Sequence, residues 1–288
     1  MTEEPSGPTV LRILLGTQLR RLREARGITA QQAAQAIRAS ESKISRIELG
    51  RNAFREVDIA DLLSLYGVKD VAEREQMLAL ASQANQPGWW HSYQDVLPTW
   101  FQAYIGLEES AECIRSYDSQ FVPGLLQTEA YASAVIELGE FSLEETERLV
   151  VLRKERQKRF TSGGLRLWTL IDEMALRRPV GGPDLMRGQL QYLLEVSDRP
   201  GLTLQYTPYP AGGSYLVPGS FSIMRFAAED LPDVVYVEQL TSAMYLDKPT
   251  DVDRYTVAMD KVSATSATPE RTREFIRELL EDMEGSSP

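Results

Sequence analysis

Hydrophobic residues recur at helical spacing near the start of the chain. Leu11, Leu15, Leu19 and Leu22 fall on one side of a helix, and arginines occupy the other side. Gly27 follows, in the position where a glycine commonly ends a helix. The pattern predicts one amphipathic helix that packs its leucine side against other helices and turns its arginines outward.

Two shorter helices are predicted next, each with its own capping residue. Thr29 precedes a helix over Ala30 to Ile37, and Gln32 stands three residues after Thr29, as in a capping box. Ser40 caps a third helix, which ends at Gly50. Only Arg38 and Ala39 separate the second helix from the cap of the third. Two short helices joined by such a tight turn are typical of a helix-turn-helix.

The hydrophobic pattern changes near residue 85. Val57 to Tyr66 and Val71 to Ala84 read as two further helices, and Gln86-Pro-Gly-Trp-Trp90 then breaks the helical pattern. We therefore expect three parts: a disordered lead-in (residues 1–8), an all-α head of five helices (9–84) and a body (85–288).

The body mixes helical and strand patterns and is predicted to be an α+β domain that serves as effector and dimerisation unit. The expected helices are Glu108 to Arg115, Gln127 to Leu138, Leu143 to Phe160, Pro183 to Val196, Val252 to Ala264 and Pro269 to Met283. The expected strands are Leu165 to Ile171, Leu202 to Tyr206, Ser220 to Phe226 and Val234 to Val237.

Charge is distributed unevenly along the chain. Ten basic and three acidic residues between Val10 and Arg55 give that stretch +7, although the whole chain carries −11. The remainder therefore carries −18. A basic head on an acidic body is the asymmetry expected of a protein whose one end meets nucleic-acid phosphate.

The helix after Ser40 carries the candidate chemistry. Its apolar side holds Ile44 and Ile47, so its polar side chains face outward, as a helix in the major groove requires. The predicted DNA-contacting residues are Gln31, Arg38, Ser40, Glu41, Ser42, Lys43, Ser45, Arg46, Arg51 and Arg55. Arg20 and Arg23 are expected to be surface residues without such a role.

The stretch from Ser40 to Gly50 matches Ser-x-x-x-Ile-Ser-x-x-Glu-x-Gly and resembles an Xre-type, lambda-repressor-like helix-turn-helix. The resemblance covers roughly residues 10 to 70 and implies that the helix 40–48 is the recognition helix. It also implies that Glu48 is structural. The chain departs from the family at Arg38, where glycine is common, so Arg38 is expected to adopt the turn conformation itself.

A second resemblance covers the body. Phe121-Val-Pro-Gly-Leu-Leu-Gln-Thr-Glu-Ala-Tyr131, Leu170 to Gly182 and Val235 to Glu238 are similar to WhiJ-like actinobacterial regulators, which join an Xre head to an antitoxin-type domain. The resemblance implies an antitoxin-like regulator with a small protein partner.

Outside the helix after Ser40, three further groups of residues could bear on function. Aromatic residues are frequent after the break. They line a ligand or partner site, anchor the linker to the core of the body, or form a dimer seam: Trp89, Trp90, Tyr93, Trp100, Phe101 and Tyr104. With one cysteine and one histidine, no metal site, cofactor or catalytic site is expected. The adjacent carboxylates Asp172 and Glu173 lack a nucleophile or histidine beside them.

The sequence therefore predicts a cytoplasmic, non-enzymatic transcription regulator that binds double-stranded DNA as a homodimer, with no membrane segment. Its body is expected to respond to a protein partner. Two alternatives stay open: a small-molecule-responsive regulator with a pocket among the aromatic residues, and an interaction scaffold whose head no longer reads DNA.

Overall fold

The fold comes from a computed structural model that describes residues 8–50, 53–209, 219–227 and 231–285. The chain forms two compact units. The helical unit takes in the chain up to Gln94 together with Pro98–Ser110, and the sheet unit takes in Asp95–Leu97 and most of the chain from Ala111 onward. The predicted fold class is confirmed: a helix-turn-helix region of helices is followed by an α+β body with a mixed sheet.

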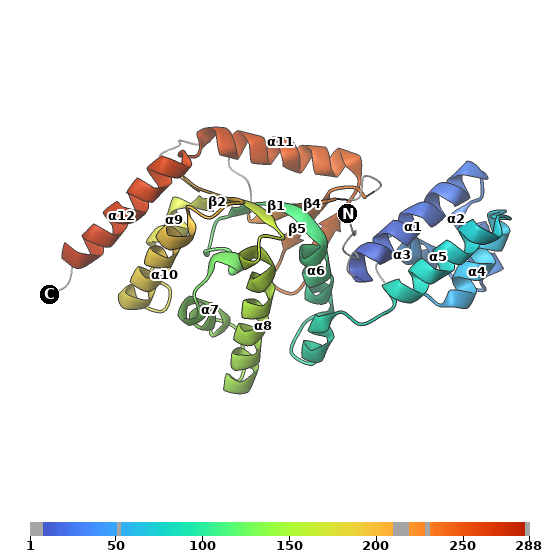
Figure 1. The fold of residues 1–288 in the computed structure, drawn as a ribbon, viewed down its shortest axis with the longest axis horizontal. Coiled ribbons are helices and arrows are strands. Elements are labelled where there is room, and N and C mark those ends of the chain that lie inside the picture. The colour runs from blue at the N-terminus through green and yellow to red at the C-terminus, as the bar shows by residue number, and fades with distance from the viewer. Residues whose placement is uncertain (1–7, 51–52, 210–218, 228–230, 286–288) are drawn as a thin grey trace. The chain divides into compact units, whose positions relative to one another are not determined.

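The helical unit begins with five helices, coloured from blue to cyan in Figure 1. They are α1 (Pro8–Ala25), α2 (Ala30–Ala36), α3 (Glu41–Glu48), α4 (Glu56–Leu65) and α5 (Val71–Ala84). All five contribute to one hydrophobic core, in which Leu15, Leu19, Ile44 and Ile59 are fully buried. Burial of apolar side chains of this size stabilises the fold by about 1.5–3 kcal/mol each.

Two further elements belong to the same unit: a 3-10 turn, η1 (Trp89–Tyr93), and helix α6 (Thr99–Ser110). The head boundary at residue 84 stays a prediction. The predicted lead-in falls on residues 1–7, which lie outside the described residues, and on Pro8, which begins α1.

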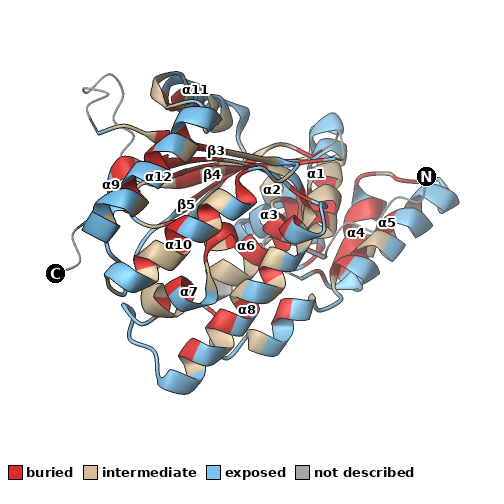
Figure 2. Ribbon diagram, turned by 60° about the vertical axis from the view of Figure 1, so that its left-hand side comes forward, coloured by how far each residue is buried: buried red, intermediate tan, exposed pale blue. Residues whose placement is uncertain are grey.

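The sheet unit is built on a sheet with strand order β3-β2-β1-β4-β5-β6. Its strands are β1 (Ala111–Asp118), β2 (Arg166–Asp172), β3 (Leu202–Thr207), β4 (Phe221–Phe226), β5 (Val234–Glu238) and β6 (Ala243–Leu246). The first three are parallel to one another, and β4 to β6 run antiparallel to their neighbours. Figure 2 shows that the strands are largely buried, as expected when helices cover both faces.

Helices cover the two faces of this sheet. They are η2 (Gly124–Leu126), α7 (Glu129–Ile136), α8 (Leu143–Thr161), α9 (Glu173–Arg177), α10 (Pro183–Val196), α11 (Pro249–Thr265) and α12 (Pro269–Gly285). On one face α11 packs Met259 and Val262 against Leu170 and Val235, and in Figure 1 α7, α8 and α10 lie on the other side.

One predicted element of the sheet unit is wrong. The sequence pattern predicts a helix over Glu108 to Arg115, but α6 ends at Ser110, and β1 begins at Ala111 and lies in the middle of the sheet. The strand pairs with β2 and β4, whose residues lie about 50 and 110 positions further along the chain, for example Arg115 with Trp168 and Ile223. Tertiary pairing therefore overrides the local helical pattern.

The motif at 121–131 folds as a hydrogen-bonded loop. The side-chain amide of Gln127 donates to the carbonyl oxygen of Val122 at 2.7 Å and accepts from Arg153 of α8 at 2.5 Å. The buried Gln189 of α10 donates to the carbonyl oxygen of Leu126 and accepts from the amide of Thr128, each at 2.7 Å. The motif therefore ties η2 and α7 to the neighbouring helices.

Candidate nucleic-acid interface

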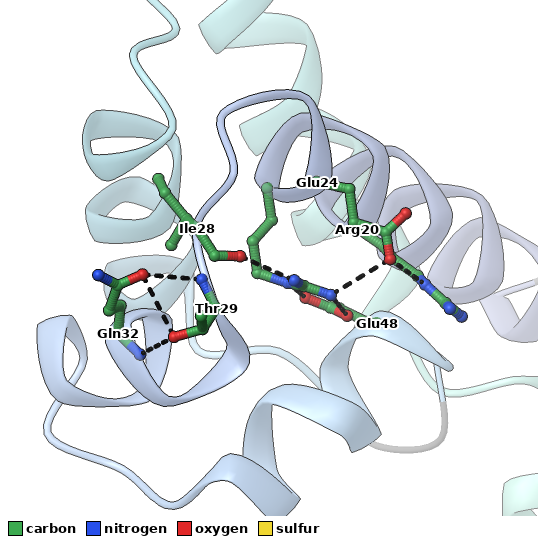
Figure 3. Close-up of polar contacts among 7 residues, drawn as sticks. Arg20, Glu24, Ile28, Thr29, Gln32 and Glu48 are labelled. Atoms are coloured by element: carbon green, nitrogen blue, oxygen red, sulfur yellow. Dashed lines mark hydrogen bonds and ion pairs between the residues drawn. The ribbon is translucent and has the colours of Figure 1, made fainter.

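Local capping positions α2 and α3, as the sequence predicts. The side chain of Thr29 accepts from the amide of Gln32, and the Gln32 side chain accepts from the amide of Thr29, which completes a capping box (Figure 3). Ser40 caps α3 by accepting from the amide of Lys43 at 3.3 Å. Arg38 in the connecting turn has φ 52°, a left-handed conformation that costs a residue other than glycine about 1 kcal/mol.

Two glycines let α1 lie directly against the end of α3. A Cβ at Gly16 would lie 2.5 Å from the carbonyl oxygen of Ile47 and 2.6 Å from that of Glu48. Gly50 has φ +62°, and a Cβ there would lie 2.6 Å from the amide nitrogen of Ile13. The backbone of α3 is thereby fixed on α1. No sequence pattern marks Gly16 for this role, because its contacts lie more than 30 residues away in the chain.

An ion pair beneath α3 adds to this attachment. Arg23 Nε and Nη2 donate to Glu48 Oε1 and Oε2 at 2.5 and 2.9 Å, and Nη1 donates to the carbonyl oxygen of Ile28 at 2.9 Å. The side chains are 12% and 8% exposed. The hydrogen bond to Glu48 raises the pKa of Arg23 above its ordinary value. Figure 3 places the side chain of Glu48 on the same side of α2 and α3 as Ile28 and the capping residues Thr29 and Gln32.

The expectation that Arg23 is a surface residue is therefore wrong. Its neighbour Arg20 does lie at the surface, where it pairs with Glu24 at 2.9 Å. The difference arises because Arg23 lies beside α3 and meets a carboxylate that is 25 residues away in sequence. Glu48 is thus placed in the interior of the unit, with its carboxylate turned toward α1 and away from solvent.

The opposite side of α3 is open to solvent. Ile44 and Ile47 are buried, whereas Ser42, Ser45 and Arg46 form an exposed stripe at positions i, i+3 and i+4. Glu41 is exposed at the start of the helix. A helix with a capped, polar N-terminus and one exposed polar stripe has the form of a major-groove recognition helix.

Lys43 lies at the edge of this stripe and already has a partner. Its ammonium nitrogen lies 2.6 Å from Oδ2 of Asp58 in α4. The remaining predicted DNA-contacting positions surround α3: Gln31 and Arg38 are exposed on α2 and in the turn, Ser40 is the N-cap, and Arg55 is exposed before α4. Arg51 lies outside the described residues.

The aromatic residues after residue 88 pack against one another within the helical unit. Trp89 and Trp90 meet edge to face with centroids 5.8 Å apart, and Phe101 stacks on Tyr104 at 5.3 Å. Trp90 is 5% exposed and fills the space beside Gly88 and Gly106, where added Cβ atoms would lie 2.4 and 3.0 Å from its ring. The ring centroid of Tyr93 lies 6.4 Å from that of Trp89, and the ring centroid of Trp100 lies 5.8 Å from that of Phe101.

The carboxylates at the ends of β1 and β2 make structural contacts. Asp172 caps α9 and accepts from the Tyr117 hydroxyl at 3.3 Å, and Glu173 pairs with Arg177 at 2.6 Å. Asp118 accepts from the hydroxyls of Ser116 and Thr169 at 2.7 and 3.3 Å. Burial raises the pKa of Asp118 to about 6, against the opposing effect of these two hydrogen bonds.

The described part of the chain contains neither a group of metal-binding side chains nor a membrane-spanning helix. No group of three or more histidine, cysteine, aspartate or glutamate side chains there is placed to hold a metal ion. No helix among the same residues is long and apolar enough to cross a membrane.

Comparison with known families agrees with the geometry of α1 to α5. Residues 14–77 match a helix-turn-helix domain family, which indicates a DNA-binding transcription regulator. Residues 101–278 match the family described as Domain of unknown function (DUF5753), and the chain belongs to that family. No curated protein and no solved structure matches the chain.

Proposed function

We propose that this protein is a sequence-specific, cytoplasmic transcription regulator that reads the major groove with α3. The observation that carries the proposal is the exposed stripe Ser42, Ser45 and Arg46 on a helix fixed from behind by Glu48 and Arg23. Arg46 suits bidentate contact with guanine, and each such contact discriminates against a wrong base by about 1–3 kcal/mol. The positive charge of residues 10–55 adds attraction to phosphate.

A salt series tests the proposal. The full-length protein is titrated onto a fluorescent 30-base-pair duplex of random sequence, and log affinity is plotted against log salt concentration. We expect a steep negative slope, to which each neutralised phosphate contributes about −0.9. Arg46→Ala weakens binding, whereas Arg254→Ala, an exposed arginine on α11, leaves it unchanged. A flat salt response in the wild-type protein contradicts the proposal.

We further propose that the protein acts as a homodimer. One recognition helix of eight residues spans only a few base pairs, so two copies are needed for a useful operator. Two α3 helices would occupy half-sites about 34 Å apart, one turn of DNA. Sedimentation of the protein with and without duplex tests this: a mass of one chain on a duplex that carries two half-sites would contradict it.

We also propose that a small protein partner binds the sheet unit. The proposal is supported by the WhiJ-like resemblance and by one apolar surface. The segment from the end of α7 to the first residue of α8 exposes Leu138, Phe141 and Leu143, with exposed fractions of 68%, 44% and 81%. Exposed glutamates stand close to them in the sequence: Glu137, Glu140, Glu144 and Glu147. Apolar side chains with an acidic rim fit a basic partner that presents apolar residues. Such a partner makes the protein antitoxin-like.

The partner proposal is tested with the product of a small open reading frame beside the gene. Titration calorimetry should show binding that is lost in Leu138→Ser/Leu143→Ser and kept in Val257→Ser, which changes an equally apolar exposed position on α11. Full binding by the double variant contradicts the assignment of this surface.

A small-molecule-responsive regulator is the second candidate. It has less support, because Trp90 and Tyr104 are buried and the aromatic rings pack on one another. Quenching of tryptophan fluorescence by a metabolite extract in the wild-type protein, but not in Trp89→Phe, would favour it.

A further inference from the structure

One contact of the recognition helix has no role in the function proposed above. Lys43 Nζ lies 2.6 Å from Oδ2 of Asp58, and the two side chains are 33% and 6% exposed. Lys43 is in the first turn of α3, next to the exposed Ser42, and Asp58 is in the first turn of α4. The pair therefore joins the rim of the candidate DNA-binding surface to the interior of the helical unit.

The energetics favour the lysine staying on the aspartate. Removing the cation from a nearly buried carboxylate destabilises the fold far more than an exposed ion pair stabilises it. A lysine side chain that pairs with phosphate at a DNA surface is fully hydrated before binding and gains less. Asp58 therefore competes successfully for a cation that stands beside the DNA-facing stripe.

We propose that Asp58 limits the DNA affinity of this protein by holding the ammonium group of Lys43 away from the phosphate backbone. The inference rests on the proposed DNA-binding function and assigns a regulating contact within that same surface. Lys43 is then a positioning residue that joins α3 to α4, and the base-reading stripe consists of Ser42, Ser45 and Arg46.

Removing the charge of Asp58 tests the inference. With the full-length Asp58→Asn variant and the random-sequence duplex, we expect tighter binding and a salt slope that is steeper by about 0.9, the contribution of one more phosphate contact. Asp61→Asn is the matched control, because Asp61 is exposed on the same helix and loses the same charge. Its slope should equal that of the wild-type protein.

A second variant shows whether Lys43 supplies the extra contact. Lys43→Met/Asp58→Asn should return to the wild-type slope, since it has neither the restraint nor the released ammonium group. Thermal unfolding of Lys43→Met, Asp58→Asn and the double variant measures the coupling between the two side chains without DNA. Asp58→Ser replaces Asp58→Asn if the amide variant does not fold.

The outcomes separate this inference from the function on which it rests. An unchanged slope in Asp58→Asn, with a wild-type protein that binds the duplex, overturns the role of Asp58 alone. A steeper slope that persists in the double variant also overturns it, because the gain then comes from lost repulsion and not from Lys43. Failure of the wild-type protein to bind any duplex overturns both.

Discussion

The two units of this protein stabilise buried or partly buried carboxylates in different ways. In the helical unit each of Glu48 and Asp58 faces a cation, Arg23 and Lys43, at 2.5 and 2.6 Å. In the sheet unit Asp118 receives hydrogen bonds from two hydroxyls and forms no ion pair within the described part of the chain. An ion pair stabilises the charged form of a carboxylate and fixes the helix that carries it. Two hydroxyl donors stabilise the charged form less, so burial still raises the pKa of Asp118 and favours its protonated form. The comparison predicts different responses to mutation and to pH.

The largest effect is expected from Glu48→Ala. It leaves the guanidinium of Arg23 in a mostly buried site without its carboxylate, which should lower the free energy of unfolding by about 3–5 kcal/mol. Urea unfolding measures this, and Glu41→Ala on the exposed side of the same helix should change the value by no more than about 0.5 kcal/mol. Normal stability with lost sequence preference would make Glu48 a base reader.

The second effect concerns pH and the sheet unit. The pKa of Asp118 is raised from 3.8 to about 6 by burial, so between these values the folded chain holds a proton that the unfolded chain releases. The free energy of unfolding therefore falls as the pH rises through this interval, by up to about 3 kcal/mol.

Denaturant titrations of the wild-type protein and Asp118→Asn, at several pH values between about 4 and 7, isolate this contribution. The nearby charge of Glu238 also raises the pKa of Asp118, so Glu238→Gln should reduce the pH dependence slightly. A difference between wild type and Asp118→Asn that does not vary with pH would mean that Asp118 stays charged in the folded protein.

Gly16→Ala gives an intermediate effect. Alanine in a helix interior is ordinarily more favourable than glycine by about 1 kcal/mol. Here the added Cβ would lie 2.5 Å from the carbonyl oxygen of Ile47, so α3 must move off α1. Overpacking of this kind costs about 1–3 kcal/mol, which should exceed the gain from the higher helix propensity of alanine. Thermal unfolding decides: a variant more stable than wild type would show that α1 and α3 separate at little cost.

The smallest effect is expected from Tyr66→Phe. The Tyr66 side chain is buried, and its hydroxyl has no hydrogen-bond partner among the described residues, although Glu48 and Arg23 are near enough to influence its pKa. Removing the hydroxyl should raise the free energy of unfolding by up to about 1 kcal/mol. A loss of stability in urea unfolding would instead indicate that the hydroxyl is hydrogen-bonded in solution.

The candidate interface could be predicted from sequence where it depends on neighbours in the chain. Thr29 with Gln32, Ser40, Gly27 and the left-handed Arg38 act within a few residues of their own position, and the structure confirms the conformations expected of them. The partners of Arg23 and Lys43 are 25 and 15 residues away. Helical spacing shows that a side chain points outward from its own helix, but not which helix it meets.

The sheet unit shows the same limit on a larger scale. The strands β2 to β5 and the helices α8, α10, α11 and α12 carry clear periodic patterns and lie close to their predicted ranges. The strand β1 contains Glu112, Arg115 and Asp118 among its apolar residues, a spacing that also suits a helix. This segment forms a strand because β2 and β4 pair with it, one on each side.

The most direct test of the central claim is selection of random duplexes on the purified full-length protein, repeated with Arg46→Ala. We predict that the wild-type protein enriches an inverted repeat with half-sites one DNA turn apart, and that the enrichment disappears in the variant. No enrichment by the wild-type protein at low salt, or the same enriched sequence in both proteins, would contradict sequence reading by α3.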